Sequence, residues 1–175
     1  MNAFMNYRGL NALGFLACTA AMGFAYLLQY GYDLEPCSMC MLQRIAMVSL
    51  GIFFLIAFIH NPGKTGLRVY GTLQLLAATA GEVLAGRHVW LQHLPEDKVP
   101  ACGPNWDFMV DEFPIMEIIA TIMKGAGECA EISWELMGLS IPEQLLIGFS
   151  LLWLLALMIL LQPKFLTDKM ALYKP

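Results

Sequence analysis

Four long apolar stretches dominate this chain of 175 residues, near 10–30, 41–60, 70–90 and 145–161. A helix needs about 20 apolar residues to cross the roughly 30 Å of hydrocarbon in a lipid bilayer, and each stretch approaches or reaches that length. Because 58% of all residues are apolar and only 14% are charged, a conventional soluble domain and an intrinsically disordered chain are both excluded. The sequence therefore predicts an all-α membrane protein, a single domain over 1–175 in which four transmembrane helices form a bundle.

Local signals mark the limits of two of these stretches. Pro62 and Gly63 follow directly on the second stretch and predict that its helix ends near His60. The sequence Ser-Ile-Pro-Glu at 140–143 has capping-box spacing with a proline in the first turn. It predicts the start of the fourth helix.

Basic and acidic residues alternate between the hydrophilic segments. Twelve of the 14 carboxylates, all except Glu82 and Asp168, lie at Asp33 and Glu35 or within 96–143. Six of the 10 Lys and Arg residues lie near the termini or in 61–69: Arg8, Lys64, Arg68, Lys164, Lys169 and Lys174. Because cytoplasmic loops carry the excess of Lys and Arg, we expect both termini and the 61–69 turn on the cytoplasmic side of the membrane, which in bacteria is the inner membrane. The segments 31–40 and 91–143 would then be periplasmic, and a net charge of −4 gives no indication of a nucleic-acid partner.

The long outer segment contains one amphipathic pattern. After Pro114, isoleucines recur at helical spacing, at Ile115, Ile118, Ile119 and Ile122. This periodicity predicts a short helix with one apolar face. The helix could lie on the membrane surface, or it could pack against the rest of the loop.

The chain has five cysteines, and their positions divide them into two groups. Cys18 falls in the middle of the first apolar stretch and is expected to be a small buried apolar residue. The other four lie in the two outward segments, two in each: Cys37, Cys40, Cys102 and Cys129. Disulfides persist in the oxidising periplasm, so the even number, the paired placement and the compartment together predict disulfide chemistry.

Cys37 and Cys40 form a CxxC motif directly before the second stretch. The free N–H groups and the dipole of a helix N-terminus favour a thiolate, which is the reactive form of cysteine. Arg44 follows Cys40 by one helical turn, where a guanidinium could stabilise a thiolate or an oxyanion on a bound electron acceptor. The alternative for Arg44 is an ordinary contact with lipid headgroups.

Cys102 and Cys129 are 27 positions apart in the long outer segment. A disulfide between them could be purely structural, stabilising the loop by about 3 kcal/mol on the chain-entropy model. Gly103 and Pro104 beside Cys102 instead favour an exposed, mobile turn. Such a turn could reach both an external partner and the CxxC motif.

The chain resembles the disulfide bond formation protein B (DsbB) family over nearly its whole length. The resemblance rests on three groups of residues: Pro36-Cys37-x-x-Cys40 with Gln43-Arg44, the sequence Arg87-His88-Val89-Trp90, and the pair Cys102 and Cys129. It implies a protein-dithiol:quinone oxidoreductase that reoxidises a DsbA-like periplasmic thiol oxidase. The electrons would pass to the membrane quinone pool, with ubiquinone or menaquinone as the co-substrate.

The resemblance also implies a role for each matching residue, with redox-active disulfides Cys37–Cys40 and Cys102–Cys129. Cys102 resembles the cysteine that forms the mixed disulfide with the partner, and Cys129 is its pair. Cys37 would receive electrons from the loop pair, and Cys40 would be the thiolate that reacts with the quinone. Arg44 and His88 match residues beside the quinone.

Three alternatives stay open at this point. The four outward cysteines, or three of them with His88 or His93, could form a tetrahedral zinc site, although the oxidising compartment favours disulfides and no metal is expected. The chain could also be a structural four-span scaffold with two inert disulfides. Finally, it could be a DsbB paralogue that serves a different dithiol partner.

Overall fold

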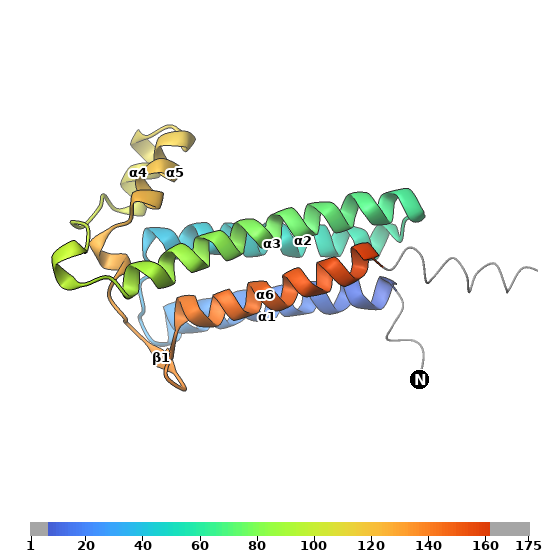
Figure 1. Cartoon of the computed structure of the whole chain (residues 1–175), viewed down its shortest axis with the longest axis horizontal. Helices are drawn as coiled ribbons and strands as arrows, with labels where there is room; N and C mark the ends of the chain where they lie inside the picture. Colours follow the sequence, from blue (N-terminus) through green and yellow to red (C-terminus); the bar gives the residue numbers. More distant parts are fainter. Residues whose placement is uncertain (1–6, 162–175) are drawn as a thin grey trace, which may run out of the picture.

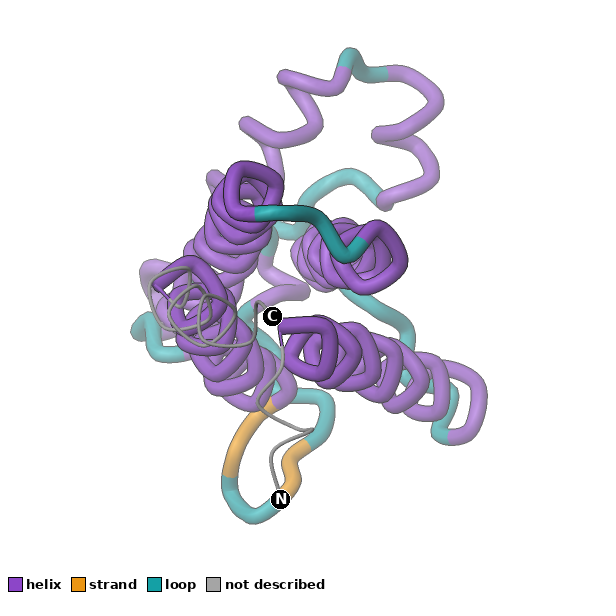
Figure 2. The backbone as a smooth tube through the Cα atoms, turned by 90° about the vertical axis from the view of Figure 1, so that its right-hand side faces the viewer, coloured by secondary structure: helices purple, strands orange, loops and turns teal. Residues whose placement is uncertain are grey.

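The computed structural model describes residues 7–161. Four long helices lie side by side in a bundle (Figures 1 and 2): α1 (Tyr7–Gly31), α2 (Ser38–His60), α3 (Lys64–Gln92) and α6 (Ile141–Leu161). The predicted helical bundle is therefore confirmed. Lys164, Lys169 and Lys174, on which part of the expected topology depends, lie outside the described residues.

Three of the described helices, α1, α2 and α6, are long and apolar enough to cross a membrane. The longest helix, α3, has 29 residues but is not among them. It carries Arg68, Glu82 and Arg87 along its length, and these charges lower its mean hydropathy. Length and composition therefore mark α1, α2 and α6 of the described helices as able to span a membrane, and the predicted span on α3 stays a prediction.

The helix ends follow the predicted signals, with two differences. At Asn61 the backbone turns left-handed (φ 42°) and its N–H donates to the Ala57 carbonyl oxygen, which ends α2. At the start of α6, Ser140 N–H donates to Glu143 Oε2 at 2.7 Å, which is half of the predicted capping box. The Ser140 hydroxyl instead donates to Gln92 Oε1 at 2.7 Å and joins α6 to the end of α3. The four helices also begin three to six residues before the predicted stretches, because polar residues extend a helix beyond its apolar part.

Two glycine–phenylalanine contacts hold the core of the bundle together. Phe54 and Phe149 are fully buried. A Cβ on Gly14 would lie 2.7 Å from the Phe54 ring, and one on Gly81 would lie 2.2 Å from the Phe149 ring. Small residues let membrane helices approach closely, so these glycines join α1 to α2 and α3 to α6. In contrast, α1 and α6 touch each other only sparsely.

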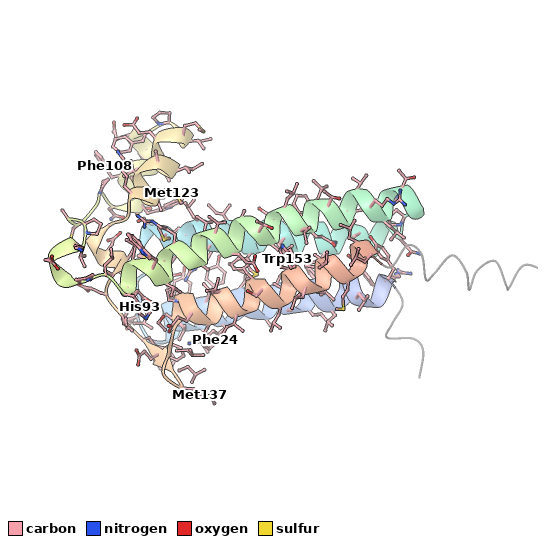
Figure 3. All side chains as sticks on the ribbon, in the orientation of Figure 1. Phe24, His93, Phe108, Met123, Met137 and Trp153 are labelled. Carbon is pink, nitrogen blue, oxygen red and sulfur yellow. The ribbon has the colours of Figure 1, made fainter. Side chains whose placement is uncertain are left out.

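The segment between α3 and α6 folds over one end of the bundle. It contains η1 (Glu96–Lys98), α4 (Trp106–Glu112), α5 (Ile115–Lys124), η2 (Gly127–Cys129), β1 (Glu135–Leu136) and β2 (Leu139–Ser140). The α4–α5 pair lies on one side of this end and the hairpin on the other (Figure 1). The two short antiparallel strands were not predicted. Met137 and Gly138 both have positive φ between them, which is the backbone of a tight hairpin turn, and Met137 lies at its exposed tip (Figure 3).

The predicted amphipathic helix is α5, and its apolar face is divided between two surroundings. Ile118 and Ile122 are buried, whereas Ile115 and Ile119 are exposed. Packing against the loop is therefore confirmed for the first two, and a membrane-surface position of the others stays a prediction. Arg87 on α3 donates from Nε to the Met123 carbonyl oxygen at 3.2 Å, and from Nη2 to that of Lys124 at 3.2 Å. This contact attaches the end of α5 to the bundle.

Candidate active site

The CxxC motif lies at the N-terminus of α2, as predicted. Cys37 is the N-cap residue, and its sulfur accepts a hydrogen bond from Cys40 N–H at 3.3 Å. The two sulfurs are 3.0 Å apart. A disulfide bond is about 2.05 Å long, so a shift of roughly 1 Å would bring these sulfurs to bonding distance.

His88 reaches the same site from α3. It is buried, and its Nε2 lies 3.8 Å from Cys37 Sγ. Gln43, also buried, directs its Nε2 to His88 Nδ1 and to the Leu84 carbonyl oxygen, both at 3.3 Å. An amide nitrogen can only donate, so Nδ1 accepts and the imidazole proton is on Nε2, facing the Cys37 sulfur. The other amide atom, Gln43 Oε1, is buried without a hydrogen-bond partner.

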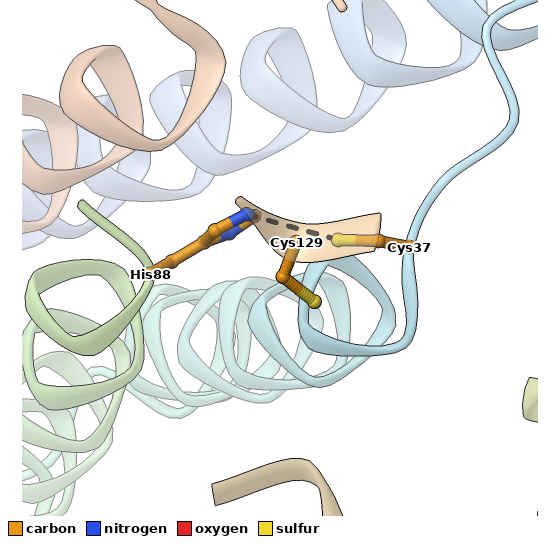
Figure 4. Close-up of side chains that lie close together, drawn as sticks. All are labelled: Cys37, His88 and Cys129. Atoms are coloured by element: carbon orange, nitrogen blue, oxygen red, sulfur yellow. Dashed lines mark hydrogen bonds between the residues drawn. The ribbon is translucent and has the colours of Figure 1, made fainter. Parts of the chain in front are cut away.

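Cys129 is the second cysteine of the long segment, and the fold brings it to the CxxC motif. It is buried at the end of η2, and its sulfur, Cys37 Sγ and a ring nitrogen of His88 all lie within 4.8 Å of one another. Figure 4 shows these three side chains converging from α2, α3 and the loop. The long segment therefore folds back across more than 90 positions of sequence to place one of its cysteines in the site.

Cys102 is the exposed member of the four outward cysteines. Its segment lies against Gly127, two positions before Cys129, and Gly127 N–H donates to the Ala101 carbonyl oxygen at 3.2 Å. A Cβ on Gly127 would lie 2.8 Å from the Pro100 carbonyl oxygen and 3.5 Å from Cys102 Sγ. The two cysteine-bearing segments of the long loop are therefore neighbours, with Cys102 toward solvent and Cys129 toward the bundle. Their predicted pairing stays a prediction.

Cys37 and Cys129 are harder to ionise than a free cysteine. A hydrogen bond with Cys37, together with burial, raises the pKa of Cys129 above its ordinary range. A hydrogen bond from Cys129 favours the Cys37 thiolate, but contact with Cys40 and burial outweigh it and raise the pKa of Cys37. The Cys40 N–H at the helix N-terminus does favour the Cys37 thiolate, as expected, but burial among other sulfurs has the larger effect and the pKa of Cys37 is raised overall.

Arg44 points across the bundle to α1. Its Nη2 donates to the Ala25 carbonyl oxygen at 3.2 Å, its Nη1 donates to Gln29 Oε1, and its guanidinium lies 5.3 Å from the centre of the Tyr26 ring. These protein contacts do not fit the alternative in which Arg44 serves only lipid headgroups. They hold the positive charge next to the CxxC motif.

Two connected cavities adjoin these residues. The first, of about 450 Å³, lies at the outer end of the bundle, and Cys37, Cys40, Gln43, Arg44 and His88 all contribute to its lining. The second, of about 510 Å³, is an apolar groove between α1 and α6. The two share six lining residues: Ala21, Ala25, Leu28, Met47, Ile141 and Leu145. The chamber that contains the sulfurs of the CxxC motif thus adjoins an apolar groove between α1 and α6, two helices that pack sparsely against each other.

Comparison with known proteins agrees with this architecture. The family model for "Disulfide bond formation protein DsbB" matches residues 7–159. The chain belongs to the DsbB family. Similar DsbB-family relatives include "Disulfide bond formation protein B" of Hahella chejuensis, 48% identical over 159 residues (89% of this chain and 96% of the relative). The proteins of the same name from Marinobacter nauticus, 44% identical (90% and 94%), and Nitrosococcus oceani, 42% identical (87% and 90%), are also similar.

For this DsbB-family chain, the structure brings together five of the six predicted site residues: Cys37, Cys40, Cys129, Arg44 and His88. Cys102 lies apart from them on the exposed side of the loop. The sequence indicates Gln43 only as part of the Gln43-Arg44 motif and does not indicate that it orients His88. No local pattern could have indicated that its amide orients a histidine 45 positions away.

Proposed function

We propose that this DsbB-family protein reoxidises a periplasmic DsbA-like thiol oxidase and transfers the two electrons to a membrane quinone. The observation that carries the proposal is the grouping of Cys37, Cys40, Cys129 and His88 at a cavity that opens into an apolar groove. An isolated structural disulfide would need neither the groove nor the half-buried charge of Arg44.

The first step is exchange at the exposed cysteine. A partner thiolate attacks Cys102 of the Cys102–Cys129 disulfide, a mixed disulfide forms with Cys102, and Cys129 leaves as a thiolate. The exposure of Cys102 and the burial of Cys129 support this order, because attack on a disulfide requires access to the attacked sulfur.

The second step moves electrons from the loop to α2. The Cys129 thiolate attacks Cys37 of the Cys37–Cys40 disulfide, forming a Cys37–Cys129 bond and releasing Cys40 as a thiolate. The position of Cys129 within 4.8 Å of Cys37 supports this step. The second partner thiol then resolves the mixed disulfide, so that the partner leaves oxidised and Cys102 is released as a thiolate. Cys102 attacks Cys129 of the Cys37–Cys129 bond, which re-forms Cys102–Cys129 and releases Cys37 as a thiolate, to which His88 Nε2–H can donate.

The quinone, ubiquinone or menaquinone, accepts the two electrons and two protons. The 450 Å³ chamber is within the usual size range of small-molecule sites. Cys40 would react with the ring, and re-formation of the Cys37–Cys40 disulfide would supply the two electrons. Arg44 and His88 would bind the polar ring. The apolar groove between α1 and α6 suits an isoprenoid tail, because it opens along helices that cross the membrane.

We further propose that α3 is a fourth span, so that 1–175 forms a single four-span domain in the bacterial inner membrane. At 1.5 Å per residue its 29 residues extend about 43 Å, which exceeds the hydrocarbon thickness, and it packs closely against α2 and α6. Both termini and the 61–63 turn would then be cytoplasmic, and the cysteine-bearing segments would face the periplasm.

Quinone reduction by the purified protein, supplied with a reduced DsbA-like partner, tests this function. Wild type should reduce quinone in proportion to the partner oxidised. Cys40→Ser should abolish quinone reduction, yet it should still trap the partner on Cys102. Wild-type protein that oxidises its partner without consuming quinone would contradict the proposal.

A further inference from the structure

The cluster around Cys37 has the donor set of a metal site as well as that of a redox site. Cys37 Sγ, Cys129 Sγ and a ring nitrogen of His88 lie within 4.8 Å of one another. Cys40 Sγ, 3.0 Å from Cys37 Sγ, adds a third sulfur. Three sulfurs and one imidazole nitrogen are a preferred set of ligands for zinc.

We propose that the fully reduced protein binds one thiophilic divalent cation, such as Zn²⁺, through Cys37, Cys40, Cys129 and His88. Binding converts the thiols to thiolates, whose protons pass to solvent, and no electrons move. The ion would hold the protein in its reduced form until it is removed. This inhibitory role rests on the proposed function, because only reduced sulfurs can bind and only an exhausted quinone supply would leave all of them reduced.

Two of the donor distances lie close to those of a tetrahedral site, and Cys40 has to move closer to the remaining donors to complete it. With Zn–S bonds of about 2.3 Å and Zn–N bonds of about 2.0 Å, neighbouring donor atoms lie roughly 3.5 to 3.8 Å apart. Cys37 Sγ and His88 Nε2, at 3.8 Å, already have this spacing. The Cys37 and Cys40 sulfurs need to separate by less than about 1 Å from their 3.0 Å contact, and Cys129 approaches from a loop segment rather than from the bundle.

The surroundings of His88 also allow it to serve as a metal ligand. When Nε2 binds a metal, its proton must move to Nδ1, and Nδ1–H then needs an acceptor. Gln43 has that acceptor in its buried, unpartnered Oε1, which reaches Nδ1 if the amide turns over. The same glutamine can therefore support either tautomer, one facing a thiol and the other facing a metal ion.

The charge around the site favours a bound cation. Three thiolates, a neutral imidazole and a divalent cation leave one net negative charge. Glu35, Glu128 and Glu131 line the same cavity and attract a cation, whereas the Arg44 guanidinium, which also lines it, offsets part of the negative charge.

The test uses full-length protein in detergent, reduced with a non-thiol reductant, with no quinone or partner present. Zn²⁺ affinity is measured by competition with a chromophoric chelator, and Co²⁺ absorption reports sulfur coordination. We expect one ion per chain. The Zn²⁺ affinity should be at least tenfold weaker in His88→Ala and in Cys129→Ser, because each variant removes one of the four proposed ligands. Cys102→Ser and His93→Ala are the matched controls and should bind Zn²⁺ like wild type. Cys102 is exposed and lies outside the cluster, and His93 Nδ1 forms a hydrogen bond with the Val89 carbonyl oxygen.

Three results would overturn the proposal: no bound ion in reduced wild type, undiminished binding in both His88→Ala and Cys129→Ser, or equal loss in Cys102→Ser. Cys129 lies in the loop, so its variant remains informative if His88→Ala fails to fold. In a second assay, pre-reduced wild type given quinone should be oxidised at least tenfold more slowly with Zn²⁺ bound, and a chelator should restore the rate. Failure of quinone reduction without Zn²⁺ would count against the proposed function, whereas a rate unchanged by bound Zn²⁺ would count against the inhibitory role.

Discussion

His88 Nε2 lies 3.8 Å from Cys37 Sγ, and the opposite ring nitrogen accepts a hydrogen bond from Gln43. With the glutamine amide in this orientation, the imidazole proton is on Nε2, which faces the sulfur. The arrangement makes Gln43 a positioning residue, which acts on the chemistry through His88.

Replacement of Gln43 by leucine should slow electron transfer without unfolding the bundle. Loss of an orienting hydrogen bond to a functional histidine typically costs about 10- to 100-fold, and we expect quinone reduction to fall within that range. Gln74→Leu is the matched control, since Gln74 is equally buried but bonds to Asn11 away from the site. It should affect thermal stability more than turnover, and equal rates in the two variants would contradict the role of Gln43.

Arg44→Ala should weaken quinone use while the fold persists. Loss of a charged hydrogen-bond donor costs about 1.5–3 kcal/mol, which predicts a rise of roughly 10- to 100-fold in the apparent KM for quinone. The control is Arg8→Ala, because Arg8 lies over the Phe58 ring and outside the lining of the reactive chamber. Unchanged quinone kinetics in Arg44→Ala would show that the guanidinium only joins α2 to α1.

The raised pKa values of Cys37 and Cys129 predict a pH-dependent labelling pattern in the reduced protein. Alkylation needs the thiolate, so at pH 7 the exposed Cys102 should react faster than the half-buried Cys37 and the buried Cys129. Labelling of Cys129 should accelerate only well above pH 9, as measured by mass spectrometry of digested samples. Fast labelling of Cys129 at pH 7 would contradict its burial beside Cys37.

The raised pKa of Cys129 also determines in which direction the stability of the folded protein changes with pH. An unfolded cysteine ionises near about pH 8.5, below the pKa of Cys129 in the folded chain. As pH rises, the unfolded state therefore loses its proton first, so the stabilising contribution is full below about pH 8.5 and declines above it. The thermal midpoint of the reduced protein should fall between pH 8 and 10 more than that of Cys129→Ser, and equal declines would contradict the assignment.

Gly127→Ala should disturb the exchange with the partner more than the reaction with quinone. The added Cβ would lie 2.8 Å from the Pro100 carbonyl oxygen and would push on the segment that carries Cys102. We expect slower oxidation of a protein partner, with quinone reduction by a small dithiol less affected. Gly86→Ala, whose Cβ would meet no atom within 4 Å, is the control. Equal rates for both variants with the protein partner would argue against this packing.

Most of the bundle could be predicted from the sequence because a long apolar stretch indicates a membrane helix. The end of α2 and the start of α6 also have clear local signals. The hairpin at 135–140 could not be predicted, because its strands have two residues each and too little periodicity. The charged residues of α3 have a similar effect, since they weaken the signal of the longest helix.

The site was predictable in its residue types but not in its arrangement. The CxxC spacing indicated the contact between Cys37 and Cys40, since both lie in one helical turn. The approach of Cys129 and His88 depends on how the long loop folds over the bundle, including the Arg87 contact with the end of α5. Such contacts across the chain have no local signature, and neither does the pKa of Cys37, which depends on neighbours brought together by the fold.

The proposed electron route depends most on the attack of Cys129 on Cys37, and one disulfide measurement tests that step directly. The double variant Cys40→Ser/Cys102→Ser keeps Cys37 and Cys129 at the site, and mild oxidation followed by peptide mapping should reveal a Cys37–Cys129 disulfide that forms rapidly. The control Cys40→Ser/Cys129→Ser keeps Cys37 and the exposed Cys102 and should form its disulfide far more slowly. Free Cys37 and Cys129 thiols after oxidation, or equal rates in the two variants, would contradict the electron route.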